Sequence, residues 1–242
     1  MAERRGIQVG EDNSSAGALA ADTRIEMMAE QDETVFRLMC FAVLLLTGMV
    51  RDYYWWLRGY LRSGVRQSFG ELVDEILRGY RESLSASAPL AFFGILYFGG
   101  LAAYIGAPRL MAWSWVPLPP AIRWAAVILS WVGAIGEMWS FSAIGRQYSP
   151  FLRIKKGHEL IKNGPYGWIR HPLYSFGFPM IVGLGLTASN WFLLLTGLAT
   201  LMVAVVARVP QEEAVLTEAF GDSYREYMRQ TPALFPRIRR NA

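Results

Sequence analysis

Apolar residues gather in five long runs along this chain, separated by polar, basic or proline-containing segments. The runs cover residues 35–50, 89–108, 121–144, 173–187 and 191–207. A helix that crosses a bilayer needs about 20 apolar residues. The first run reaches that length only if it continues through residues 53–56, past Arg51 and Asp52. We therefore expect five membrane-spanning helices, or four if the first run only enters the interface.

The connections between the runs refine this picture. The last two runs are joined only by Ala188-Ser189-Asn190, and so short a joint predicts an antiparallel helical hairpin. Apolar residues recur at helical spacing over about 66–86, with charged residues between them. That pattern predicts an amphipathic helix, which lies either in the membrane interface or against the rest of the protein.

These elements predict an all-α, polytopic integral membrane protein with a C-terminal helical hairpin. We expect three parts: a polar flexible tail over 1–34, an N-terminal membrane region over 35–144 that includes the amphipathic helix, and a functional core over 145–242.

Composition and charge support the membrane assignment and give an orientation. Apolar residues make up 53% of the chain and charged residues only 18%, which leaves too little polar surface for a soluble globule. The net charge is +4, but the basic residues flank the apolar runs, a pattern that argues against nucleic acid binding. They are concentrated after the first run, after the third run and at the chain's end. The positive-inside rule places these segments in the cytoplasm, and five spans then place the acidic N-terminus outside. The single cysteine, Cys40, provides no cluster for a metal, so we expect no metal partner.

The connection before the fourth run contains both histidines of the chain, His158 and His171. It ends in Arg170-His171-Pro172, and Pro172 suits the first turn of the following helix. Arg170 and His171 would then lie among the free backbone N–H groups of that helix, at a corner suited to anions. The alternative is that both residues only anchor the helix to lipid headgroups.

A second candidate segment, from Arg208 to Glu213, follows the fifth run. Pro210 suggests that a new helix opens here, with Glu212 and Glu213 in its first turn, where acids are also ordinary capping residues. Gly221 should end this helix, and Asp222 or Ser223 should cap the next. Both candidate segments emerge on the same membrane face, so they can meet. Within the third run, the carboxylate of Glu137 is either functional or paired with an arginine.

Two separated motifs carry a resemblance to a known family. The first combines His158-Glu159-Leu160, Gly164-Pro165-Tyr166 and Arg170-His171-Pro172-Leu173-Tyr174. The second combines Glu212-Glu213 with Phe220-Gly221, Tyr224, Tyr227, Pro232 and Pro236. In this order around a helical hairpin, they resemble the isoprenylcysteine carboxyl methyltransferase family, which is related to the membrane phospholipid methyltransferases. The resemblance covers about 145–238.

The resemblance implies a non-Rossmann methyltransferase that holds S-adenosylmethionine in a cytosolic pocket, with the catalytic loops and the C-terminus in the cytoplasm. It implies that Tyr166, Arg170, His171 and Tyr174 hold the methionine end of the cofactor and that Glu212 and Glu213 reach its ribose or amino group. Arg208 would grip a substrate carboxylate and, with Glu212, form the catalytic pair. The full cofactor-binding set it implies is His158, Glu159, Leu160, Gly164, Tyr166, Arg170, His171, Pro172, Tyr174, Glu212 and Glu213.

Several functions remain open at this point. The resemblance implies a lipophilic or prenylated acceptor that is methylated on a carboxylate or thiol. It also implies membrane lipids as partners of the protein. Within the same chemistry, a phospholipid amine or a small thiol is an alternative acceptor. A membrane NADPH-dependent sterol-type reductase and a non-enzymatic membrane scaffold are more distant alternatives.

Overall fold

The computed structural model describes residues 31–49, 84–145 and 159–236, and these residues form helices joined by short connections. The α-helices are α4 (Leu84–Gly106), α5 (Pro120–Ile144), α6 (Pro172–Thr187), α7 (Trp191–Phe220) and α8 (Asp222–Gln230), and residues 31–49 are also helical. Two 3-10 helices, η2 (Pro108–Ser114) and η4 (Gly164–Gly167), lie in the connections. No strand occurs in these ranges apart from an isolated bridge between Trp115 and Asn190, so the all-α prediction is confirmed.

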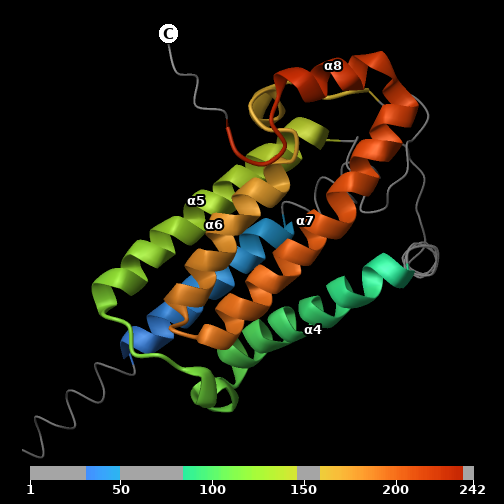
Figure 1. The fold of residues 1–242 in the computed structure, drawn as a ribbon. Coiled ribbons are helices and arrows are strands. Elements are labelled where there is room, and N and C mark those ends of the chain that lie inside the picture. The colour runs from blue at the N-terminus through green and yellow to red at the C-terminus, as the bar shows by residue number, and fades with distance from the viewer. Residues whose placement is uncertain (1–30, 50–83, 146–158, 237–242) are drawn as a thin grey trace, which may run out of the picture.

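The long helices run side by side as a bundle, and α8 lies across one end of it (Figure 1). Each of the five predicted apolar runs falls in a helix of this bundle. Among the described residues, three segments are long and apolar enough to cross a membrane: Ala88–Gly106, Pro120–Ile144 and Trp191–Phe220. Helix α6 is apolar but has only 16 residues, about 24 Å at 1.5 Å per residue, which is shorter than the roughly 30 Å hydrocarbon core. The membrane protein class is confirmed, and the count of five spans stays a prediction.

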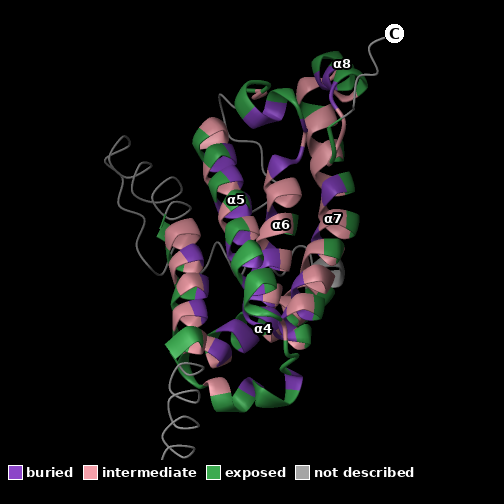
Figure 2. Ribbon diagram, turned by 90° about the vertical axis from the view of Figure 1, so that its left-hand side faces the viewer, coloured by how far each residue is buried: buried purple, intermediate pink, exposed green. Residues whose placement is uncertain are grey.

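The surface of the bundle has the character that lipid requires. Large apolar side chains such as Ile95, Ile128 and Val206 are exposed on the long helices. Buried residues instead follow the faces along which the helices meet, as Figure 2 shows. An apolar exterior of this kind is stable only against hydrocarbon.

Helices α6 and α7 form the predicted antiparallel hairpin. Asn190 caps α7, because its side-chain oxygen accepts the N–H of Leu193 at 3.0 Å. Its amide nitrogen donates to Ser114 Oγ at 2.7 Å, which ties the hairpin joint to η2. Glycines bring α6 against α5: a Cβ placed at Gly183 would lie 2.4 Å from the backbone nitrogen of Ser130. The two backbones therefore meet with no room for a side chain.

Helix α7 corrects one prediction. The sequence predicted a span ending at residue 207 and a new helix opened by Pro210, but α7 continues through Pro210 to Phe220. Pro210 removes one backbone hydrogen bond from α7. In the residues that follow, Glu213 binds Arg170 and Glu212 binds Tyr174 of α6, and these contacts keep the helix continuous. At 30 residues, about 45 Å, α7 is longer than the hydrocarbon core, so its last third projects beyond it. Gly221 ends α7 at φ +55° as predicted, but Gly221 itself precedes α8, and neither Asp222 nor Ser223 caps that helix with its side chain.

The N-terminal boundary is also corrected. Residues 31–34, predicted as the end of a flexible tail, are helical, and Glu33 is bound to the bundle. Its carboxylate lies 2.7 Å from Arg123 Nη1 and accepts the hydroxyl of Tyr104 at 2.8 Å. Arg123 also donates through Nε to the carbonyl of Thr187 at 2.9 Å, which links α5, α6 and the N-terminal helix.

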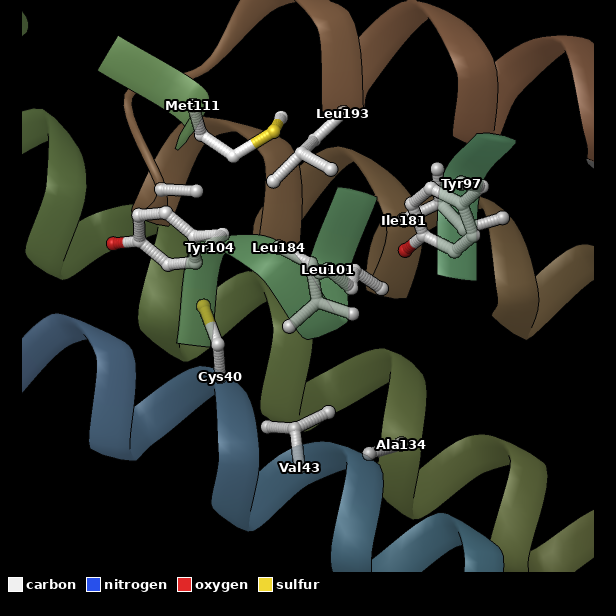
Figure 3. Packing of buried hydrophobic residues seen from close by; sticks show 11 residues of the cluster. Cys40, Val43, Tyr97, Leu101, Tyr104, Met111, Ala134, Ile181, Leu184 and Leu193 are labelled. Atoms are coloured by element: carbon white, nitrogen blue, oxygen red, sulfur yellow. The ribbon is translucent and has the colours of Figure 1, made fainter. Parts of the chain in front are cut away.

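The hydrophobic core of the bundle lies next to the contact between Glu33 and Arg123. Cys40 and Val43 of the N-terminal helix point toward α4 and α5 (Figure 3). The cluster that they join contains Tyr97, Leu101, Tyr104, Met111, Ala134, Ile181, Leu184, Ala188 and Leu193. The predicted tail over 1–30, the first 18 residues of the amphipathic segment (66–83) and His158 lie outside the described residues.

Candidate functional site

The predicted site residues gather where α6 begins, opposite to the end of the bundle that holds Arg123. Helix α6 starts at Pro172 and His171 is its N-cap, as predicted, because proline fits a position whose N–H has no helical partner. Here the projecting end of α7, helix α8 and the segment 231–234 surround residues 170–175. The two candidate segments of the sequence therefore meet, as expected.

Arg170 is the residue that joins these elements. Its Nε and Nη2 donate to Glu213 Oε1 of α7 at 3.0 and 2.7 Å. Its Nη1 donates to the carbonyls of Met228, at 3.1 Å, and Thr231. These carbonyls end α8, where a cation is favourable because it meets the negative end of the helix dipole. Four of the five N–H groups of an arginine are thus used within the protein.

The backbone before α6 is bound to a segment near the C-terminus. Arg170 N donates to the carbonyl of Pro232 at 2.9 Å, and His171 N donates to that of Ala233 at 3.0 Å. Ser175 Oγ donates to the carbonyl of Leu234. The sequence placed Arg170 and His171 at the start of this helix, but it did not predict that residues 232–234 bind there.

His171 is buried between the two glutamates of α7. Its Nε2 lies 3.1 Å from Glu213 Oε1, and its Nδ1 lies 3.4 Å from Glu212 Oε2. Tyr174 donates to Glu212 Oε1 at 2.8 Å. Arg208 approaches the same oxygen within 3.9 Å from one turn earlier on α7. The predicted residues Arg170, His171, Tyr174, Arg208, Glu212 and Glu213 therefore form one charged cluster.

The earlier part of the first motif, residues 158–166, contributes less directly. Glu159 is exposed and Leu160 is half-buried, and neither makes a side-chain hydrogen bond within the described part of the chain. Gly164 has φ +57°, a conformation that glycine adopts without strain, and it opens η4. Tyr166 of η4 is buried, and its carbonyl accepts the hydroxyl of Tyr227 from α8.

Two parts of the site were missed or only partly found from sequence. No sequence pattern in residues 231–234 indicates their role. Of these residues only Pro232 was named, and only through the resemblance. Tyr224 and Tyr227 were expected on the helix after Gly221, but the sequence did not predict that both lie buried on α8. Burial raises the pKa of Tyr227 to about 12, which keeps its hydroxyl protonated.

Glu137 lies elsewhere. A Cβ at Gly177 would be 3.2 Å from its Oε1, which places Glu137 against α6 about one and a half turns beyond His171. Within the described residues, no group of three or more His, Cys, Asp or Glu side chains is placed to hold a metal ion.

Known proteins are similar to this chain over the region that contains the site. The family described as phospholipid methyltransferase matches residues 121–223, from α5 to the start of α8, so the match begins earlier than the predicted boundary at 145. The nickel-cobalt-cadmium resistance protein NccN of Alcaligenes xylosoxydans xylosoxydans is 36% identical over 48% of this chain and 53% of its own length. The protein-S-isoprenylcysteine O-methyltransferase of Schizosaccharomyces pombe is 32% identical over 39% of this chain and 41% of its own length.

A solved structure, that of a eukaryotic intramembrane Ras methyltransferase (isoprenylcysteine carboxyl methyltransferase), has a TM-score of 0.45. It has 17% identity and covers 85% of this chain and 98% of that one. The chain spans about half the length of the curated relatives it matches. These relatives, together with the family match, confirm that the chain resembles the isoprenylcysteine carboxyl methyltransferases and the related phospholipid methyltransferases.

Proposed function

We propose that this protein is an integral membrane methyltransferase that uses S-adenosylmethionine and methylates a carboxylate or thiol of a lipophilic acceptor. The observation that carries the proposal is the charged cluster of Arg170, His171, Tyr174, Arg208, Glu212 and Glu213. It lies where α7 leaves the apolar bundle, beside the segment that is similar to phospholipid methyltransferases.

The residues of the cluster fit the proposed cofactor. S-adenosylmethionine presents an ammonium, a carboxylate and a ribose diol, and the cluster presents both carboxylates and cations. The side chains of Arg208 and Glu212 are 30% and 25% exposed, so ligand atoms can reach them. Glu212 and Glu213 would accept from the ribose hydroxyls or the amino group, and Tyr166 and Tyr174 would line the pocket. Bound there, the cofactor supplies an electrophilic methyl group.

The pairing of Arg170 changes the role that we propose for it. The resemblance implied that Arg170 grips the methionine carboxylate, but its guanidinium is bound to Glu213 and to two carbonyls of α8 and its following turn. We propose that Arg170 positions Glu213 and α8 around the pocket. Arg208, at the edge of the cluster, is the better candidate for an anionic group of the cofactor or the acceptor.

The position of His171 in the cluster also indicates which kind of acceptor the site suits. Both ring nitrogens of His171 face carboxylate oxygens within 3.4 Å, so this histidine is not placed to take a proton from an acceptor. A carboxylate acceptor is already an anion and needs no base, whereas an amine must first lose a proton. The site therefore favours a carboxylate or an acidic thiol over a phospholipid amine. The chain's task is then to align donor and acceptor and to exclude water.

We propose that the cluster faces the cytoplasm. The described basic residues Lys162, Arg225 and Arg229 lie at this end of the bundle, and Glu33, near the acidic N-terminus, lies at the opposite end. The acceptor would then enter from the bilayer between helices, and the cofactor from the cytosol.

The relatives whose names state metal resistance do not favour a second function. Their similarity covers about half of this chain, and their names state no reaction. A sterol-type reductase stays an alternative that a binding experiment separates, because it would take NADPH.

The experiment is calorimetric titration of the detergent-purified full chain with S-adenosylhomocysteine and, separately, with NADPH. We expect micromolar binding of S-adenosylhomocysteine alone. Glu212→Gln should weaken it at least tenfold, because it removes the charge shared by Tyr174, His171 and Arg208. Glu226→Gln is the matched control, since Glu226 is exposed on α8 and accepts from Arg229 and Gln230 of the same helix. Binding of NADPH alone, or equal affinity in both variants, would contradict the proposal.

A further inference from the structure

Helix α8 carries two buried tyrosines that differ in the hydrogen bonding of their hydroxyl groups. Tyr224 and Tyr227 lie three positions apart on the same face, with ring centroids 5.9 Å apart. The hydroxyl of Tyr227 donates to the carbonyl of Tyr166. The hydroxyl of Tyr224 is buried and has no hydrogen-bond partner among residues 31–49, 84–145 and 159–236.

A buried hydroxyl without a partner is unfavourable. It has given up its hydrogen bonds to water and regains none, at a cost of about 1–3 kcal/mol. Phenylalanine would fill the same space without that cost, and native structures leave few such groups. A tyrosine at this position is therefore favourable only if its hydroxyl meets a partner in some state of the protein.

The surroundings of Tyr224 indicate where that partner binds. The residue is only 1% exposed and lies within the electrostatic reach of Glu213, Arg170 and Glu212. Burial, followed by the charge of Glu213, raises the pKa of Tyr224, so the hydroxyl keeps its proton and can donate. Arg170 and Glu213 are already bound to each other. The hydroxyl of Tyr224 is thus a protonated, unpaired donor beside the charged cluster.

We propose that the Tyr224 hydroxyl is a ligand contact that hydrogen-bonds a polar atom of the bound S-adenosylmethionine. This inference rests on the proposed function, since it names a further residue of the same pocket. It explains why the hydroxyl of Tyr224 has no partner among the described residues while that of Tyr227 has one. Tyr227 holds α8 to η4, and Tyr224 receives its partner with the cofactor.

The test compares Tyr224→Phe with Tyr227→Phe in the detergent-solubilised full chain, and wild type is titrated first. Each variant is titrated with S-adenosylhomocysteine and melted without ligand. Tyr224→Phe should weaken binding about 3- to 10-fold, the value of one hydrogen bond, with an unchanged or higher melting temperature. Tyr227→Phe should lower the melting temperature, because it removes the hydroxyl that donates to the Tyr166 carbonyl. Titration with 5′-methylthioadenosine, which lacks the amino-acid end, shows whether the contact is to that end or to the nucleoside.

Two results would overturn the inference. Wild-type affinity in Tyr224→Phe would show that the hydroxyl contacts no ligand atom. A lower melting temperature with unchanged affinity would show that it has a structural partner, such as an ordered water. Both are distinct from failure of the proposed function, in which wild type itself does not bind S-adenosylhomocysteine.

Discussion

The contact between Glu33 and Arg123 should hold the N-terminal helix on the bundle, and replacing Arg123 by methionine tests this. Methionine keeps an unbranched apolar side chain, shorter than that of arginine, and removes the charge and the donors. The guanidinium lies 2.7 Å from Glu33, donates to the carbonyl of Thr187, and stacks 3.9 Å over the ring of Phe36. Arg123→Met leaves Glu33 with the Tyr104 hydroxyl and leaves the Thr187 carbonyl without this donor.

The size of the effect follows from burial. Removing one partner of a fully buried ion pair costs about 3–5 kcal/mol. The side chains of Arg123 and Glu33 are 9% and 30% exposed, so water can partly rehydrate the glutamate. We therefore expect a loss of about 2–3 kcal/mol in the free energy that holds residues 31–49 in place. Because about 1.4 kcal/mol corresponds to a factor of ten, the detached population should rise roughly 30- to 150-fold.

Cys40 provides the assay. It is the chain's single cysteine, it is buried, and it lies on the N-terminal helix against the core (Figure 3). A maleimide can reach it only after that helix moves, so the labelling rate follows the detached population when opening is fast. Arg109→Met is the matched control, because Arg109 is an exposed cation of η2 at the same end of the bundle. An unchanged labelling rate in Arg123→Met, or equal acceleration in Arg109→Met, would refute the reasoning.

Two further predictions concern the packing of α6 and the corner before it. Gly183→Ala should lower the melting temperature by several degrees, because the new methyl group would meet the backbone of α5, whereas Gly99→Ala, with open space at its Cβ, should not; equal melting temperatures would contradict this. Arg170→Lys should lower both the melting temperature and the affinity for S-adenosylhomocysteine, because one ammonium cannot replace the paired bonds to Glu213 while also reaching the carbonyls that end α8. A variant that melts as wild type but binds less tightly would restore a direct ligand role for Arg170.

The parts of the fold that local chemistry determines could be predicted from sequence. Pro172 opens α6, Asn190 lies in the joint of the hairpin, and Gly221 ends α7. Each follows from the N–H that proline lacks, the length of the connection or the freedom of glycine. That the two candidate segments meet also followed, because the topology places both on one face of the membrane.

The parts that distant contacts determine could not be predicted. Pro210 gave a strong local signal for a helix start, but contacts of the following turn with α6 keep α7 continuous. The partners of the backbone N–H groups of Arg170 and His171 could not be predicted, because they lie about 60 residues further along the chain. Arg123 lies near a short proline-containing connection, and nothing in the sequence around it indicates that it is buried.

Two arginines at opposite ends of the bundle, Arg123 and Arg170, make the same combination of contacts. This combination limits what Arg170 can bind in the candidate site. Arg123 donates to the carbonyl of the last residue of α6, and Arg170 donates to carbonyls at the end of α8. Each also pairs with a glutamate from another helix, Glu33 or Glu213. An arginine of this kind closes a helix end and fixes a distant segment, so it is costly to divert toward a ligand. If Arg170 stays committed in this way, the anionic end of the proposed cofactor needs other donors, and among the described residues Arg208 within the cluster and Tyr224 beside it can supply them.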